Sequence, residues 1–202
     1  IGYDGLRTRY KALLVTIDKD YTVSSGWGFN LAYTLSKAEQ DGGDLFSLDK
    51  VTPDKYGWRP IADQDERHRI VLSGIVDLPV GFQFSTLTTL GSGTAFQLLD
   101  QSAGTSINQQ TIRSLYRPKN CLGSVFAFCE VNLTLQNNIK VFNTHNINVA
   151  VDLLNAFNNK NYTGYSGNLG VGETYSFGGP TNLPTGLLTL PRRFQFRVGY
   201  RF

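Results

Sequence analysis

The side chains best suited to chemistry in this sequence are two cysteines, Cys121 and Cys129, and two histidines, His68 and His145. A zinc site needs three or four ligands, and the histidines lie far from the cysteines in sequence, so we expect no metal site. The cysteines are close enough to form a small disulfide loop in an oxidising compartment. Two free, buried thiols are the alternative.

The histidines are expected to be structural. His68 has an arginine on either side, which indicates a polar cluster at a strand end, with Asp63 or Asp65 as partner. His145 is expected in a tight turn, in contact with solvent. No serine lies in a G-x-S-x-G elbow, and the glycine pairs fall in predicted loops rather than between a strand and a helix. We therefore expect neither catalysis nor a cofactor.

Aromatic side chains in the last long loop are the candidates for ligand contact. They are Tyr162, Tyr165, Tyr175 and Phe177. Aromatic rings supply contact area at a low cost in conformational entropy. The same rings could equally pack the loop against itself, and both roles stay open at this point.

Composition narrows the class of protein that must position these residues. Of the 202 residues, 17% are charged, whereas a soluble domain usually has about 25%. The net charge of +3 is small and scattered, so we expect no nucleic-acid partner. No apolar run approaches the roughly 20 residues of a membrane-spanning helix. Membrane strands remain possible, because their alternation keeps the average hydropathy near that of a soluble protein.

Alternation of apolar and polar residues with a period of two is the main signal in the sequence. In the last segment one face carries Phe194, Phe196, Val198, Tyr200 and Phe202. Six earlier segments show the same pattern, some of them with exceptions. They begin near Lys11, Trp27, Ile70, Phe82, Val131 and Ile147. The pattern predicts seven antiparallel strands in an all-β fold.

The connections between these strands alternate in length. Residues 21–26, 79–81 and 143–146 form short links, whereas residues 39–65, 97–128 and 158–191 are predicted as long, structureless loops. Short turns at one end and long loops at the other are typical of an outer-membrane β-barrel, with the turns in the periplasm. A soluble β-sandwich also alternates, but it favours short loops of even length, so we place it second.

Charged residues distinguish the two faces of the predicted strands. Asp152, Arg197 and Arg201 lie among the polar positions. A charge that faces lipid near the midplane costs about 2–4 kcal/mol. The polar face is therefore predicted to border water and the apolar face to contact lipid, with aromatic residues such as Trp27 and Phe202 near the interfaces.

Four segments carry a further resemblance. They are residues 31–38 (LAYTLSKA), 65–74 (DERHRIVLSG), 151–158 (VDLLNAFN) and 191–202 (PRRFQFRVGYRF). Their order and spacing resemble the C-terminal barrel portion of TonB-dependent outer-membrane receptors of the Oar-like group, which carry a carboxypeptidase regulatory domain. The resemblance extends over nearly the whole chain.

The resemblance implies a 22-stranded barrel in the outer membrane of a diderm bacterium, closed by an N-terminal plug. It implies ligand-gated import of a large ligand (a siderophore, glycan or peptide) that is energised through TonB. Tyr200 and Phe202 resemble the C-terminal signal that the barrel-assembly machinery reads. The expected partners are thus outer-membrane lipid, this machinery, TonB through the missing N-terminal region, and an unknown large ligand.

The sequence departs from that family pattern in one respect. It contains neither a plug nor a TonB box, and seven strands do not close such a barrel. Because the chain starts at Ile1 and contains no methionine, we expect residues 1–202 to be the C-terminal segment of one barrel domain. A structural or adhesive barrel without active transport is the alternative, and a passive porin lacking the plug is a third possibility.

Overall fold

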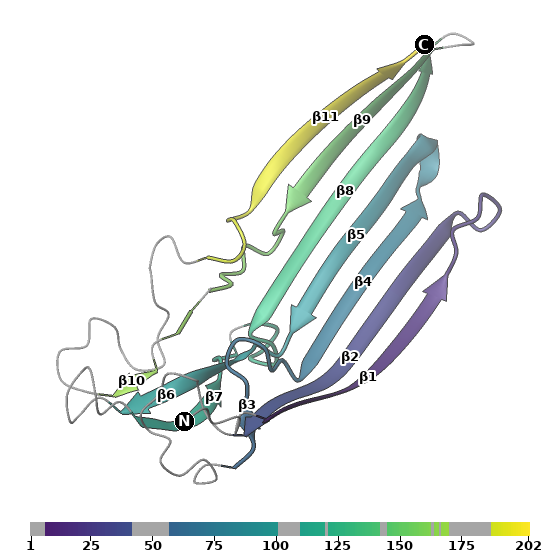
Figure 1. Cartoon of the computed structure of the whole chain (residues 1–202). Coiled ribbons are helices and arrows are strands. Elements are labelled where there is room, and N and C mark those ends of the chain that lie inside the picture. The colour runs from purple at the N-terminus through teal and green to yellow at the C-terminus, as the bar shows by residue number, and fades with distance from the viewer. Residues whose placement is uncertain are drawn as a thin grey trace.

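Seven long strands form one antiparallel sheet in the computed structural model (Figure 1). The structure describes residues 7–41, 57–100, 110–119, 121–141, 145–162, 164–165, 167–169 and 187–202. The strands are β1 (Arg7–Lys19), β2 (Trp27–Asp41), β4 (His68–Asp77), β5 (Phe82–Gly91), β8 (Phe128–Val141), β9 (His145–Leu154) and β11 (Arg193–Arg201). They pair in the order β1-β2-β4-β5-β8-β9-β11. The predicted all-β fold and its seven strands are confirmed.

The two ends of the sheet differ, as the loop lengths predict (Figure 1). At one end, which we call the turn end, β4 and β5 are joined by the short 3-10 turn η3 (Pro79–Gly81). The turn predicted over residues 143–146 is partly wrong. His145 and Asn146 already belong to β9 and pair with Val141 and Lys140, while residues 143–144 lie outside the described residues.

The opposite end, which we call the loop end, is more ordered than the sequence predicts. Two-residue strand β3 (Arg59–Pro60) pairs with β2. Strands β6 (Ala95–Asp100) and β7 (Gln110–Tyr116) pair antiparallel, and β10 (Asn168–Leu169) adds to β6 in parallel. The prediction of structureless loops is therefore wrong for these segments. The physical reason is that loop backbone groups also need hydrogen-bond partners, and strand pairing supplies them.

The strand register places the apolar residues in continuous rows on one face. For example, Ile17, Leu31 and Leu72 are direct neighbours across β1, β2 and β4. We call this the apolar face; it includes Leu13, Val15, Ile17, Phe29, Leu31, Ile70, Leu72, Phe84, Val131, Leu133, Leu135, Val149, Val151, Phe194, Phe196 and Val198. Within the described part of the chain no second layer covers it, since Phe196 is 74% exposed and Val149 is 37% exposed.

Charged residues mark where this apolar face ends. On the apolar face of β1, no charged residue lies between Lys11 and Lys19. This distance is about 27 Å of strand at roughly 3.4 Å per residue. Toward the loop end the same face becomes ionic, and Arg9 pairs with Glu39 at 2.8 Å. Toward the turn end the Lys19 ammonium lies 4.2 Å from the centre of the Trp27 ring. At the 35–45° strand tilt usual in outer-membrane barrels, a stretch of this length spans about 19–22 Å of membrane, somewhat less than their apolar band of about 25 Å.

The opposite face of the sheet, which we call the polar face, holds the charges that the sequence assigns to it. Asp152 is 7% exposed and accepts two hydrogen bonds from the Arg197 guanidinium, at 2.7 and 2.9 Å. Thr134 donates a third at 2.6 Å. Bidentate pairing fixes the geometry of both side chains, so the pair connects β9 to β11 within this face.

Both histidines lie on the apolar face, each beside a tyrosine. His68 stacks on Tyr33 and shares a hydrogen bond of 2.9 Å with its hydroxyl. His145 stacks on Tyr200 and bonds to it through Nδ1. His68 therefore lies at a strand end, as predicted, but the predicted partners Asp63 and Asp65 are wrong. The predicted turn position of His145 is wrong as well, because it begins β9. The strand register decides both placements, because each histidine occupies an outward position of a strand.

Candidate functional site

The loop end of the sheet contains the densest set of interacting polar side chains among the described residues. Asp65 lies at its centre and is fully buried. Its Oδ1 accepts the backbone N–H of Ala38 at 2.6 Å, and its Oδ2 accepts the Tyr116 hydroxyl at 2.5 Å. The Arg67 guanidinium lies 3.2 Å from the same carboxylate. A buried charge is costly unless several partners satisfy it, and these groups join β2, the segment that leads into β4, and β7 around it.

Tyr116 is held between opposite charges. Its hydroxyl donates to Asp65 and accepts from Arg67 Nε at 2.7 Å. Burial of the ring raises the pKa of this hydroxyl, and the hydrogen bond to Asp65 raises it further. The neutral, donating form of Tyr116 is therefore the stable one at ordinary pH.

Glu66 reaches from the same segment across the polar face. Its Oε1 accepts the backbone N–H of Gly93 at 3.1 Å, and its Oε2 accepts from Arg69 at 3.0 Å. Gly93 has a φ of +83°, a conformation that favours glycine. Gly91 leaves room for the Glu66 carboxylate, because any side chain at that position would overlap it.

Arg117 anchors the last loop against the chain that follows β7. It donates to the backbone oxygen of Tyr162 and to Asp63, each at 3.0 Å. Its guanidinium carbon lies 5.6 Å from the centre of the Tyr165 ring, and that ring packs edge-on against Tyr162. Burial raises the pKa of the Tyr165 hydroxyl. Two of the predicted ligand-contact residues are thus brought together, and they take part in packing.

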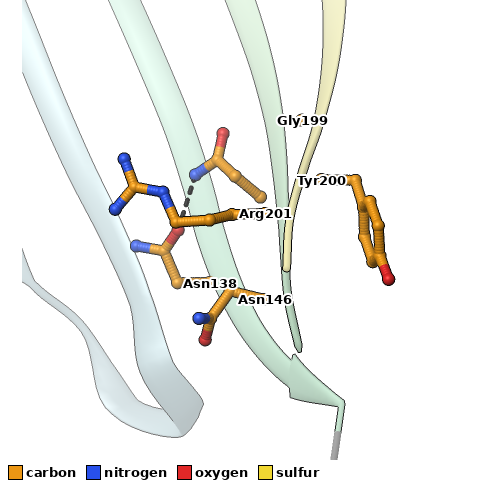
Figure 2. Close-up of a pocket in the computed structure, with 6 residues that line it drawn as sticks. Asn138, Asn146, Gly199, Tyr200 and Arg201 are labelled. Atoms are coloured by element: carbon orange, nitrogen blue, oxygen red, sulfur yellow. Dashed lines mark hydrogen bonds between the residues drawn. The ribbon is translucent and has the colours of Figure 1, made fainter. Parts of the chain in front are cut away.

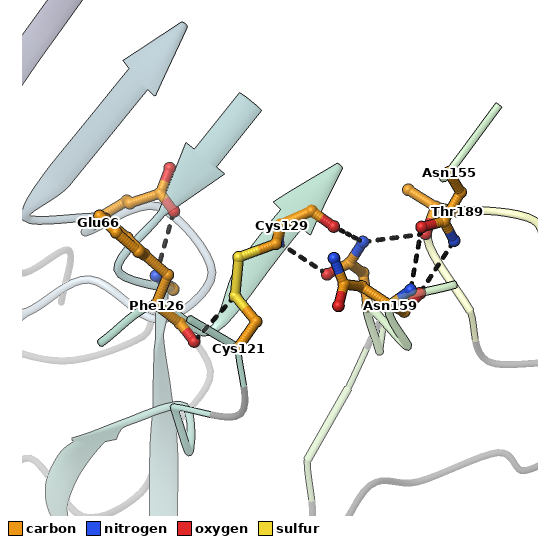
Figure 3. Close-up of a disulfide and its surroundings, with 9 residues drawn as sticks. Glu66, Cys121, Phe126, Cys129, Asn155, Asn159 and Thr189 are labelled. Atoms are coloured by element: carbon orange, nitrogen blue, oxygen red, sulfur yellow. Dashed lines mark hydrogen bonds between the residues drawn. A yellow bond between two sulfur atoms is a disulfide. The ribbon is translucent and has the colours of Figure 1, made fainter. Parts of the chain in front are cut away.

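A disulfide joins Cys121 to Cys129 and fixes the start of β8 (Figure 3). The Cα atoms are 6.4 Å apart, and Cys129 is 1% exposed. The cross-link holds the segment that precedes β8, and a backbone bridge between Cys121 and Phe126 closes the same loop.

At Cys129 on β8, the side chain of Asn161 makes the hydrogen bonds that a neighbouring strand would otherwise make. Strand β9 ends at Leu154, before it can pair with the first residues of β8. The Asn161 side chain instead accepts the N–H of Cys129 at 3.0 Å and donates to its carbonyl at 2.9 Å. A third bond goes to Thr189 at 2.9 Å. Asn161 is 2% exposed, so these bonds satisfy buried backbone groups.

Asn155 turns the chain at the end of β9. Its φ is +49°, which asparagine tolerates better than most residues. Its side chain bonds to both backbone groups of Asn159 (Figure 3). It also donates to the carbonyl of Leu190. From the sequence alone, the motif that contains Asn155 indicates only a family resemblance. The density of asparagines over residues 155–161 is the signal that could have indicated its structural role.

A cavity of about 330 Å³ lies among these side chains at the loop end of the sheet. Its walls include Glu66, Arg69, Arg117, Glu130, Asn161 and Tyr162. Two acidic and two basic side chains line it, together with the rings of Phe128 and Tyr162. Such a lining suits a polar group that both donates and accepts hydrogen bonds. Tyr175 and Phe177, the other predicted ligand contacts, lie outside the described residues.

No cluster of three histidine, cysteine, aspartate or glutamate side chains that could hold a metal ion occurs in the part of the chain that the structure describes. Nor does any helix in that part have the length and apolar character needed to cross a membrane.

Comparison with known families decides the class of this protein. The family model of the outer membrane beta barrel domain matches residues 3–175. The chain belongs to this family. Searches of curated proteins and of solved structures found no match.

Membership of the family places the barrel wall in the outer membrane. The uncovered apolar face is then the face that contacts lipid, because the polar face carries the Asp152–Arg197 ion pair. In such barrels the short turns face the periplasm and the long loops face outward. The cavity therefore lies at the outer end, where a solute from the medium arrives first.

Proposed function

We propose that this chain forms part of the wall of a TonB-dependent receptor of the Oar-like group, which imports a large ligand and catalyses no reaction. The ligand would be a siderophore, glycan or peptide. The sheet has two edges, β1 and β11, and unpaired backbone groups in lipid cost several kcal/mol each. We therefore propose that further strands of the same barrel domain pair with these edges.

The observation that carries this proposal is the contact between two of the motif segments. Ser36, in the first motif, donates its backbone N–H to Arg67 O at 3.0 Å and its hydroxyl to Glu66 O at 2.7 Å. Ala38, in the same motif, donates to Asp65. Since the second motif begins at Asp65, the two motifs act together to hold the base of the outer loops. Motifs that share one structural task support the family resemblance more strongly than isolated matches do.

The cavity at the loop end supports a role in ligand contact. Its walls combine charged groups with aromatic rings, and a peptide or a glycan presents polar groups and flat apolar patches together. Its volume, about 330 Å³, is at the small end of ligand pockets, which span roughly 300–1,000 Å³. It would accept one residue or one sugar of a large ligand rather than the whole molecule.

The test compares nutrient use in the producing bacterium. Growth on limiting iron, glycan or peptide would be measured for the parent strain, for a strain lacking this gene, and for a strain lacking TonB. If the protein is an importer, loss of the gene and loss of TonB impair growth on the same nutrient class. A defect in adhesion or envelope integrity that does not depend on TonB would instead support a structural barrel and overturn the proposal.

A further inference from the structure

A second polar cluster lies on the polar face at the turn end, far from the loop-end cavity. The register of β8, β9 and β11 places Lys140, Asn146 and Arg201 in one row across the three strands. The adjacent row consists of Asn138, Asn148 and Gly199. We call these six residues the turn-end cluster. All but Lys140 line a cavity of about 540 Å³, which Tyr200 also borders.

The side chains of the turn-end cluster are directed to the same side of the sheet. Asn138, Asn146 and Arg201 lie together on one face, whereas Tyr200 extends from the opposite face (Figure 2). Gly199 has no side chain and leaves the middle of the cluster open, since an added Cβ would meet only Asn148, at 3.8 Å. The cavity is therefore bordered by amides and a guanidinium group around an open centre.

Positive charge in this cluster is not neutralised within the described part of the chain. None of the residues that line the cavity is acidic, and neither Lys140 nor Arg201 forms a salt bridge to any described carboxylate. Arg197, four residues before Arg201 on the same face of β11, differs because Asp152 binds it in a bidentate pair.

Hydrogen-bond donors also exceed acceptors. Arg201 offers five N–H donors, Lys140 offers three, and each asparagine amide offers two. Among the described residues one bond is made within the cluster, from Asn148 Nδ2 to Asn138 Oδ1 at 2.7 Å. A group with several acceptor oxygens and negative charge satisfies such a set best, because charge-assisted hydrogen bonds are the strong ones.

We propose that the turn-end cluster binds the oxyanion group of a solute, a carboxylate or a phosphate, at the periplasmic end of the barrel lumen. Rings of arginine and lysine favour anions in aqueous pores for the same electrostatic reason. The site does not depend on TonB-energised import. It would select anionic solutes in a transporter and in a passive barrel alike, so its failure leaves the proposed function untouched.

The experiment is equilibrium dialysis of the full-length protein in neutral detergent at low ionic strength, with labelled inorganic phosphate and, separately, labelled citrate. We expect saturable binding of phosphate, citrate or both, and the two arms show which oxyanion is preferred. Arg201→Gln and Lys140→Gln each remove a charged partner, which should weaken binding about tenfold. Arg193→Gln is the matched control, because Arg193 lies on the same face of β11 at its other end; it should change binding by less than about twofold.

A second measurement covers the case in which Arg201→Gln fails to insert into the membrane. The wild-type protein is treated with phenylglyoxal, and mass spectrometry of tryptic peptides reports modification of Arg201 and Arg193. The preferred oxyanion should slow modification of Arg201 but not of Arg193. Absence of saturable binding by the wild type, equal weakening in the Arg193→Gln control, or equal protection of both arginines would overturn the proposal.

Discussion

The amide side chain of Asn161 makes hydrogen bonds to β8 that a neighbouring strand would otherwise make. Because Asn161 satisfies both backbone groups of Cys129 in a buried position, its removal leaves a buried donor and a buried acceptor without partners. We expect Asn161→Ala to lower the free energy of unfolding by about 2–3 kcal/mol. Urea unfolding of the full-length protein in detergent micelles measures this change.

Asn159→Ala is the matched control for that substitution. Asn159 lies in the same segment, but its hydrogen bonds to Asn155 come from the backbone, so its truncation should have little effect. Equal losses of stability in the two variants would show that Asn161 matters for the segment in general rather than for Cys129.

Tyr116 links stability to pH at the loop end. Its pKa is raised, so the folded protein holds this proton more tightly than the unfolded chain. The resulting stabilisation is fully present below pH about 10, the ordinary tyrosine pKa, and is lost as the pH rises through the folded-state pKa. We expect Tyr116→Phe to cost about 1 kcal/mol near neutral pH, because the ring is 38% exposed and solvent screens the interaction. Unfolding at a series of pH values should show this difference shrinking under alkaline conditions; a constant difference would contradict the assignment.

At the scale of a strand, the face on which a residue lies decides which substitutions are tolerated at its position. Leu72 and Ser73 are adjacent on β4 but lie on the apolar and the polar face. Leu72→Arg places a charge against hydrocarbon and should destabilise the barrel by about 2–4 kcal/mol. Ser73→Arg directs the same charge toward a cavity of about 450 Å³ on the polar face and should cost much less. Unfolding measurements in lipid vesicles compare the two, and equal costs would contradict the assignment of the faces.

At the scale of the whole molecule, the last strand is expected to guide assembly. Tyr200 and Phe202 lie at the turn end, and Phe202 is 89% exposed, as recognition by another protein requires. We expect Phe202→Ala to reduce, several-fold, the amount of heat-modifiable folded protein in the outer membrane. Gln195→Ala, on the polar face of the same strand, is the control and should assemble normally. Normal assembly of Phe202→Ala would contradict the proposal that Phe202 is part of an assembly signal.

Alternation by itself determined the seven long strands of the sheet and their two faces. A period of two is a local property, so residues such as Phe196 and Arg197 reveal opposite sides without any partner strand. The lengths of the connections likewise determined which end carries the loops.

Only the tertiary structure decided which polar residues meet. Asp65 and Tyr116 are 51 positions apart, and Asn161 reaches Cys129 across 32; no local pattern encodes such contacts. The register of neighbouring strands also gives His68 and His145 partners other than the predicted ones. It likewise places Lys140, Asn146 and Arg201 in one row. Register depends on pairing between distant segments, because a shift of one residue would exchange the two faces of a strand.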